Sequence, residues 1–115
     1  MKKQFSKYHS QKVKTEAGTF DSKKELNRWI ELSNEAIQGK ISHLQRQVEY
    51  ELIPSQYING KCIERKCIYK ADFVYREGED LIVEDVKSAI TRKNKDYIIK
   101  RKLMLWRYGI KIREV

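Results

Sequence analysis

The sequence predicts a single α/β domain with the element order α-β-β-β-α-β, in which helices flank a mixed central sheet. Three observations support this class. Apolar residues recur at helical spacing over 22–38 and again over 94–107. Apolar and polar residues alternate with a period of two over 47–52 and 62–75. A chain of 115 residues is long enough for one hydrophobic core and leaves little for a second domain.

Charge is unevenly distributed along the chain. Residues 1–14 and 87–115 hold most of the basic side chains, whereas 15–86 hold 10 Lys and Arg against 14 Asp and Glu. The net charge of +9 favours a polyanionic partner such as nucleic acid. A protein that only bound a polyanion would gain from losing the acidic residues of the middle segment. Binding of a polyanion alone therefore does not explain the acidic middle segment.

The composition also excludes several classes of protein. The longest apolar run, at 103–106, has four residues and is too short to span a membrane. No signal-peptide pattern is present, and two Cys with two distant His form no standard zinc set. We therefore expect a cytoplasmic protein without membrane association and with reduced cysteines. Residues 1–16 are predicted to form a basic flexible arm, and 17–115 a single domain.

The first helix is predicted over 22–38. Ser22 and Glu25 have the spacing of a capping box, in which the Ser hydroxyl accepts from the Glu25 amide and the Glu25 side chain reaches back. Trp29 belongs to the apolar stripe that follows. Gly39 is a suitable residue to end the helix.

Strands are predicted after this helix. The alternation in 47–52 ends at Pro54, and Asn59-Gly60 marks a turn. After a loop at 77–80, the apolar segment 81–87 predicts a buried strand. Between the turn and the loop we expect one long strand over 62–75, with a single apolar face formed by Cys67, Tyr69, Ala71, Phe73 and Tyr75.

The second helix is predicted to start at a cap, either Thr91 or Asn94, and to run to about Arg107. Gly109 would end it, and the alternating residues 110–115 predict a last strand. One face of this helix is interpreted as core, and its apolar residues are Ile99, Leu103 and Trp106.

Asp72, Asp85 and Lys87 form the most informative pattern. Asp85 and Lys87 are two residues apart on a strand, so their side chains point to the same face. A four-residue loop pairs position 76 with 81 and places Asp72 opposite Asp85. Two facing carboxylates repel each other unless a cation lies between them. A register slipped by one residue would place Glu84 opposite Asp72, which makes Glu84 the reserve ligand.

This pattern predicts a divalent metal site. Asp72, Asp85, the backbone carbonyl of Val86 and water form an oxygen-rich set that suits Mg²⁺, with Mn²⁺ as a substitute. Glu25 adds a third carboxylate if the first helix packs on the sheet, although its capping role explains it equally well. A divalent ion polarises a phosphate and lowers the pKa of bound water. Lys87 would orient that water or stabilise the developing charge.

The αβββαβ order with a helix Glu25, a strand Asp72 and the strand motif Asp85-x-Lys87 resembles the PD-(D/E)XK nuclease superfamily. Ala71 departs from that pattern, because it stands where the name-giving Pro would be. The resemblance implies a restriction-endonuclease-like core in which Glu25, Asp72, Asp85 and Lys87 are catalytic. The wider pattern is similar to a group of small phage and prophage proteins of that superfamily, in the segments 20–26, 44–47, 69–75, 83–87 and 109–112.

The resemblance further implies Mg²⁺-dependent cleavage of DNA. We expect a structure-specific endonuclease that acts on branched DNA in recombination, like the phage Holliday-junction resolvases. A chain without a visible second domain suits recognition of DNA shape, and symmetric cutting of two strands needs two sites, which favours a homodimer. Three alternatives remain open: a sequence-specific or nicking endonuclease, a DNA-binding accessory protein with a nuclease fold and no turnover, and a structural subunit of a phage assembly.

Side chains outside this site are candidates for DNA contact. Gln45 and Gln47 share a strand face, where they would touch DNA or order a water, although a solvated face explains them equally well. Phosphate contact is favoured for the basic second helix because few acids lie near it. Its candidate residues are Lys93, Lys95, Lys100, Arg101 and Arg107, of which the first, third and fifth are seven apart and would form one stripe.

Overall fold

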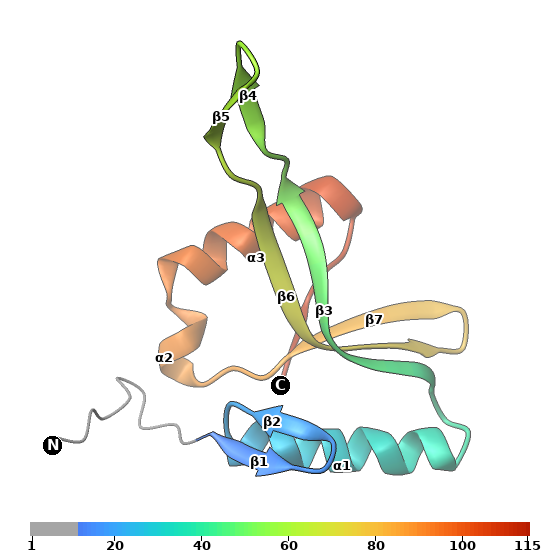
Figure 1. Ribbon diagram of the computed structural model, residues 1–115. Helices are drawn as coiled ribbons and strands as arrows, with labels where there is room; N and C mark the ends of the chain where they lie inside the picture. Colours follow the sequence, from blue (N-terminus) through green and yellow to red (C-terminus); the bar gives the residue numbers. More distant parts are fainter. Residues whose placement is uncertain (1–11) are drawn as a thin grey trace, which may run out of the picture.

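The computed structural model describes residues 12–115 (Figure 1). Residues 1–11, which make up most of the predicted basic arm, lie outside the described residues. The end of that predicted arm is ordered in a small hairpin, in which β1 (Val13–Thr15) pairs antiparallel with β2 (Gly18–Phe20). The described fold therefore begins before residue 17.

The central sheet has four strands in the order β3-β6-β7-β8. β3, β6 and β7 are antiparallel neighbours, and β8 runs parallel to β7, so the sheet is mixed. Helices flank this sheet, and the predicted α/β class is confirmed. The elements that follow β2 are α1 (Lys23–Ile37), β3 (Ser42–Ile53), β4 (Gln56–Ile58), β5 (Lys61–Glu64), β6 (Cys67–Glu77), β7 (Asp80–Asp85), α2 (Ala89–Arg92), α3 (Lys95–Tyr108) and β8 (Arg113–Glu114).

The two long helices begin where the capping residues predict. Ser22 caps α1 by accepting a hydrogen bond from the Glu25 amide, and Asn94 caps α3 by accepting one from the Tyr97 amide. Gly109 ends α3 in the left-handed conformation, with a φ of 67°. Across residues 12–115, no helix is long and apolar enough to cross a membrane.

Two apolar clusters lie against the sheet. One packs beneath α3 and contains Tyr69, Ala71 and Val74 of β6, and the other packs beneath α1 and contains Phe73 and Tyr75. The prediction of a single apolar face on this strand is therefore wrong, because its side chains change cluster on the two sides of Asp72. The strand contributes to two cores and carries the half-buried Asp72 at the change.

The predicted strand 62–75 is in fact two strands. β5 pairs with β4 to form a separate two-stranded ribbon, and β6 begins only at Cys67. The ribbon continues the line of β3 and β6 beyond the body of the protein (Figure 1). The strand predicted over 110–115 is likewise shorter and covers only Arg113–Glu114.

The face of α3 that meets the sheet differs from the prediction. Tyr97 and Met104 are its buried residues, whereas Ile99 and Trp106 are exposed, Trp106 by 80%. The physical reason lies in the packing, because Tyr97 and Met104 belong to the cluster that contains Tyr69 and Val83 of the sheet, and Leu103 of the predicted face packs against this cluster. Lys93 lies before the start of α3 and is the C-cap of α2, so the predicted basic stripe does not lie on one helix.

Candidate functional site

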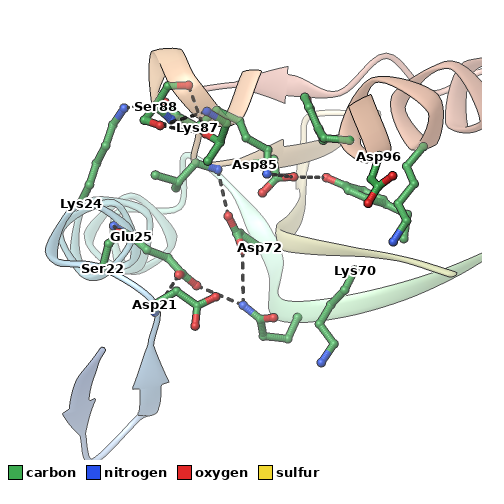
Figure 2. Close-up of a pocket in the computed structure, with 16 residues that line it drawn as sticks. Asp21, Ser22, Lys24, Glu25, Lys70, Asp72, Asp85, Lys87, Ser88 and Asp96 are labelled. Carbon is green, nitrogen blue, oxygen red and sulfur yellow. Dashed lines mark hydrogen bonds and ion pairs between the residues drawn. The ribbon is translucent and has the colours of Figure 1, made fainter. Parts of the chain in front are cut away.

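A cleft of about 600 Å³ opens where the start of α1, the middle of β3 and β6, the end of β7 and the start of α3 meet. Its walls carry both acidic and basic side chains (Figure 2). The carboxylates are Asp21, Glu25, Asp72, Asp85 and Asp96, and the ammonium groups are Lys24, Lys70, Lys87 and Lys100. All four residues predicted to be catalytic therefore line one cavity.

Asp72 and Asp85 lie where β6 and β7 part. The predicted register is confirmed, because Arg76 pairs with Leu81 and Phe73 with Glu84. The strand pairing ends with Phe73 and Glu84. One position further in the same register, Asp72 lies across from Asp85. Asp72 Oδ2 accepts a hydrogen bond of 2.9 Å from the Val86 amide, across the gap between the two strands.

The reserve ligand Glu84 is excluded from the cleft. It points toward α1, where Arg28 Nε and Nη2 donate to its two carboxylate oxygens at 2.8 and 2.7 Å. The Tyr75 hydroxyl donates to the same carboxylate. Glu84 is completely buried and its charge is compensated, so the slipped register and its metal role are both wrong.

Asp85 and Lys87 point to the same face, as predicted. Lys87 Nζ lies 3.0 Å from Asp85 Oδ2, and the Tyr69 hydroxyl donates to that same oxygen at 2.6 Å. The ammonium group also lies 4.3 Å from the centre of the Tyr97 ring, where the π face attracts a cation. Lys87 is thus held in place from two sides.

The carboxylates perturb one another. Burial and, after it, the neighbouring Asp85 carboxyl raise the pKa of Asp72 to about 8, while the hydrogen bond from the Val86 amide opposes the shift. Burial also raises the pKa of Glu25 above its ordinary value, opposed by the hydrogen bond from the Asp21 amide. Without a cation, the cluster holds a proton near neutral pH.

Glu25 serves the helix cap and the cleft at once. Its Oε2 accepts from the Asp21 amide at 3.0 Å, one residue before the N-cap to which a capping box would return. Its Oε1 accepts from Gln47 Nε2 at 3.0 Å and lies 3.7 Å from Arg46 Nη2. The buried carboxylate is therefore aimed at the sheet rather than at solvent.

Gln47 is the residue whose place the sequence did not predict. Its amide nitrogen lies between Glu25 and Asp72 and is 3.4 Å from Asp72 Oδ1. A φ of 54° sets Gln47 in the left-handed region, whereas Gln45 is exposed and does not line the cleft. The two glutamines therefore have different surroundings. β3 pairs with β6 in a register that places residue 47 across from residue 72. A prediction of this strand pairing would have placed Gln47 in the cleft.

The predicted DNA-contacting cations are dispersed. Lys100 lines the cleft, and Lys93 and Lys95 are exposed. Arg101 lies 3.7 Å from Glu114, and Arg107 donates to the carbonyl of Leu52 at 2.8 Å, so both take part in tertiary contacts.

Two lysines that the sequence reading did not single out line the cleft instead. Lys24 and Lys70 lie on opposite sides of the carboxylates (Figure 2), and Lys24 Nζ donates to the Lys87 carbonyl at 3.0 Å.

The donor set of the cleft fits a hard divalent cation. Its potential ligands are carboxylate and carbonyl oxygens, with no Cys or His among the lining residues. Asp72 and Asp85 are the central pair, and Glu25 lies across Gln47 from Asp72. Across residues 12–115, no three Asp, Glu, His or Cys side chains are already gathered closely enough to hold an ion.

A family model described as "Protein of unknown function (DUF1064)" matches residues 5–114. The chain belongs to the DUF1064 family. Neither the curated proteins nor the solved structures contain a match. The DUF1064 match includes every element that lines the cleft, so the site lies within the part of the chain that defines this family.

Proposed function

We propose that this protein is a Mg²⁺-dependent endonuclease that hydrolyses DNA phosphodiester bonds. One observation carries the proposal: Glu25 of α1, Asp72 of β6, and Asp85 and Lys87 at the end of β7 line the same cleft. These are the positions at which the sequence resembles the PD-(D/E)XK nucleases. The α1-β3-β6-β7-α3-β8 order also agrees with the core order of that superfamily.

Asp72 and Asp85 would hold the metal, with Glu25 and the Val86 carbonyl beside them. The ion, when bound, polarises the scissile phosphate and lowers the pKa of a water. Lys87 is held by Asp85 and the Tyr97 ring with its ammonium group facing the cleft. In that position it orients the attacking water or steadies the charge that develops on the phosphate. Lys24, Lys70 and Lys100 supply positive charge for the flanking phosphates.

Branched DNA is the proposed substrate, and a homodimer the proposed form. Residues 12–115 form one four-stranded sheet with its helices and two small hairpins, and contain no second folded domain for reading sequence. Recognition by the shape of a junction needs no such module. Cutting two strands symmetrically requires two clefts, which a two-fold dimer supplies.

Cleavage of synthetic four-way junctions tests this proposal. We expect the wild type to cut labelled junctions faster than linear duplexes of the same arms when Mg²⁺ or Mn²⁺ is present, and not in EDTA. Asp85→Asn should lower the single-turnover rate by at least 10²-fold, in the range seen when a group that stabilises the transition state is removed. Glu49→Gln makes the same chemical change at an exposed β3 position outside the cleft and should leave the rate unchanged.

The outcomes separate the alternatives. Equal cutting of junctions and duplexes would contradict the branched substrate but retain the endonuclease. A wild type that binds DNA and never cuts it with either metal would be an accessory binding protein, and the catalytic proposal would fail.

A further inference from the structure

The β4–β5 ribbon is a part of the described chain that the proposed site does not use. Within residues 12–115 its two strands pair only with each other, and every residue of both strands is exposed. Tyr57 and Ile58 are exposed by 63% and 62%. An isolated two-stranded hairpin is only marginally stable in water. Large apolar side chains on such an element indicate a surface that a partner covers.

The ribbon is narrow and preformed. Asn59 and Gly60 have φ values of 50° and 80° at its tip, as a two-residue turn with two left-handed positions requires. At its base, the Lys66 amide donates to the Ser55 hydroxyl at 3.0 Å. The ribbon therefore projects beyond β3 and β6 as a two-stranded hairpin with a defined turn (Figure 1).

The charge and the apolar residues of the ribbon favour a polyanionic partner with a groove that the ribbon can enter. Its apolar groups lie on both faces, because Tyr57 and Ile58 are consecutive strand residues and point to opposite sides. Tyr57 pairs with Cys62 on one face, and Ile58 pairs with Lys61 on the other. A protein surface would cover one face, whereas a groove contacts both. The charged residues of the ribbon and its base are Lys61, Arg65 and Lys66 against the single acid Glu64. In a two-fold contact through the ribbon, Lys61, Arg65 and Lys66 would lie near the same residues of the second copy, so the ribbon is an unfavourable place for the dimer contact.

We propose that the β4–β5 ribbon enters the major groove of the duplex that flanks the cut phosphate. The major groove admits a two-stranded ribbon. Lys61 and Arg65 contact the phosphates of its walls, and Tyr57 and Ile58 contact sugars and base edges inside it. This inference rests on the proposed function, since it takes DNA as the substrate.

The position of the ribbon along the sheet agrees with this role. Lys70 lines the cleft and lies three residues after Cys67, where β6 begins. At about 3.3 Å per residue, the six residues from Lys70 to Glu64, where β5 ends, place the near end of the ribbon roughly 20 Å from the cleft along the chain. The ribbon then extends roughly 13 Å more to its Asn59-Gly60 turn, so both lie within about one helical turn of DNA, which is about 34 Å.

Charge reversal at the tip tests the inference. Binding of a fluorescent four-way junction and of its linear arms is measured by anisotropy in EDTA over a range of salt concentrations. We expect Lys61→Glu to raise the Kd for both DNAs about tenfold and to lower the salt slope by about 1 to 2. Lys40→Glu makes the same change at an exposed position after α1 and should shift the Kd less than twofold. Tyr57→Ala should also weaken binding, compared with Ile37→Ala, which is 83% exposed on α1.

The result separates the ribbon from the catalytic proposal. Ribbon variants that bind DNA like their controls would overturn the inference, whether or not the wild type cuts. If the wild type never cuts DNA but Lys61→Glu weakens DNA binding, the catalytic proposal is contradicted and the inference about the ribbon is supported. Loss of a dimer in sedimentation on Tyr57→Ala, with unchanged DNA affinity, would identify a second copy as the occupant and would also overturn the inference.

Discussion

Gln47 separates two carboxylates that would otherwise face each other across the cleft. Its Nε2 donates to Glu25 at 3.0 Å and approaches Asp72 at 3.4 Å. The left-handed backbone at this position, with a φ of 54°, costs on the order of 1 kcal/mol for a residue other than glycine. The amide group offsets this cost because it supplies the donor that two buried acceptors need.

Replacing Gln47 by Glu removes that donor and adds a third carboxylate. Without divalent metal, we expect Gln47→Glu to lower the free energy of unfolding at pH 8 by roughly 2 kcal/mol, measured by urea titration. Added Mg²⁺ should restore most of the loss. The control Gln45→Glu is two residues away and exposed, so its stability should match the wild type. Equal effects of the two variants would contradict this account of Gln47.

Ionisation of Asp72 makes the folded protein less stable as the pH rises. Its pKa is raised from 3.8 to about 8, chiefly by burial, so between these values the folded state holds a proton that the unfolded chain has released. Stability then falls as the pH rises from about 4 to 8, by a few kcal/mol in metal-free buffer. Asp72→Asn should flatten this dependence and be more stable than the wild type at pH 8. Asp80→Asn, at the exposed start of β7, should retain the wild-type slope.

At the scale of the elements, a buried ion pair fixes α1 on the sheet. Arg28 donates twice to the completely buried Glu84 of β7, at 2.8 and 2.7 Å, and its Nη1 also contacts Glu31 at 2.9 Å. Glu25 lies one helical turn before Arg28, so this pair helps to set where the Glu25 carboxylate enters the cleft. The stability of the helix position and the geometry of the site are therefore coupled.

Removing the Arg28 guanidinium group should lower the free energy of unfolding far more than removing its exposed partner Glu31. Arg28→Ala leaves Glu84 charged and buried, with the Tyr75 hydroxyl as its one remaining side-chain donor within residues 12–115, and we expect a loss of about 3 kcal/mol in urea unfolding. Glu31→Ala removes an exposed pair and should cost under about 1 kcal/mol. Similar losses for both variants would show that the buried pair does not hold α1.

At the scale of the whole molecule, stability is concentrated in the sheet. β6 lies between β3 and β7 and contributes residues to both apolar clusters, whereas the ribbon has no buried residue in either strand. We expect amide hydrogen exchange to be slowest in β6, near the global unfolding free energy, and fast in Gln56–Glu64. Protection of the ribbon equal to that of β6 in the free protein would contradict this distribution.

The sequence by itself determined the local elements and much of the site. Ser22, Asn94 and Gly109 mark helix ends through caps that act within one turn. The period of two and the predicted pairing of position 76 with 81 gave the register of β6 and β7, and with it the approach of Asp72 to Asp85 and Lys87. The predicted 77–80 loop is shorter in the structure, because Glu77 pairs with Asp80 and only residues 78–79 form the turn. These features depend on residues close in sequence or on a single short connection, so one amino-acid sequence is enough to predict them.

Only the tertiary structure decided the rest. β6 changes cluster at Asp72 because α1 and α3 pack on different parts of it, and no local pattern records that choice. Gln47, Lys24 and Lys70 reach the cleft through pairing and packing between distant segments. Trp106 lies outside the core because α3 turns Tyr97 and Met104 to the sheet instead. Periodicity limits which face of an element is apolar, but the partner element decides which apolar residues are buried.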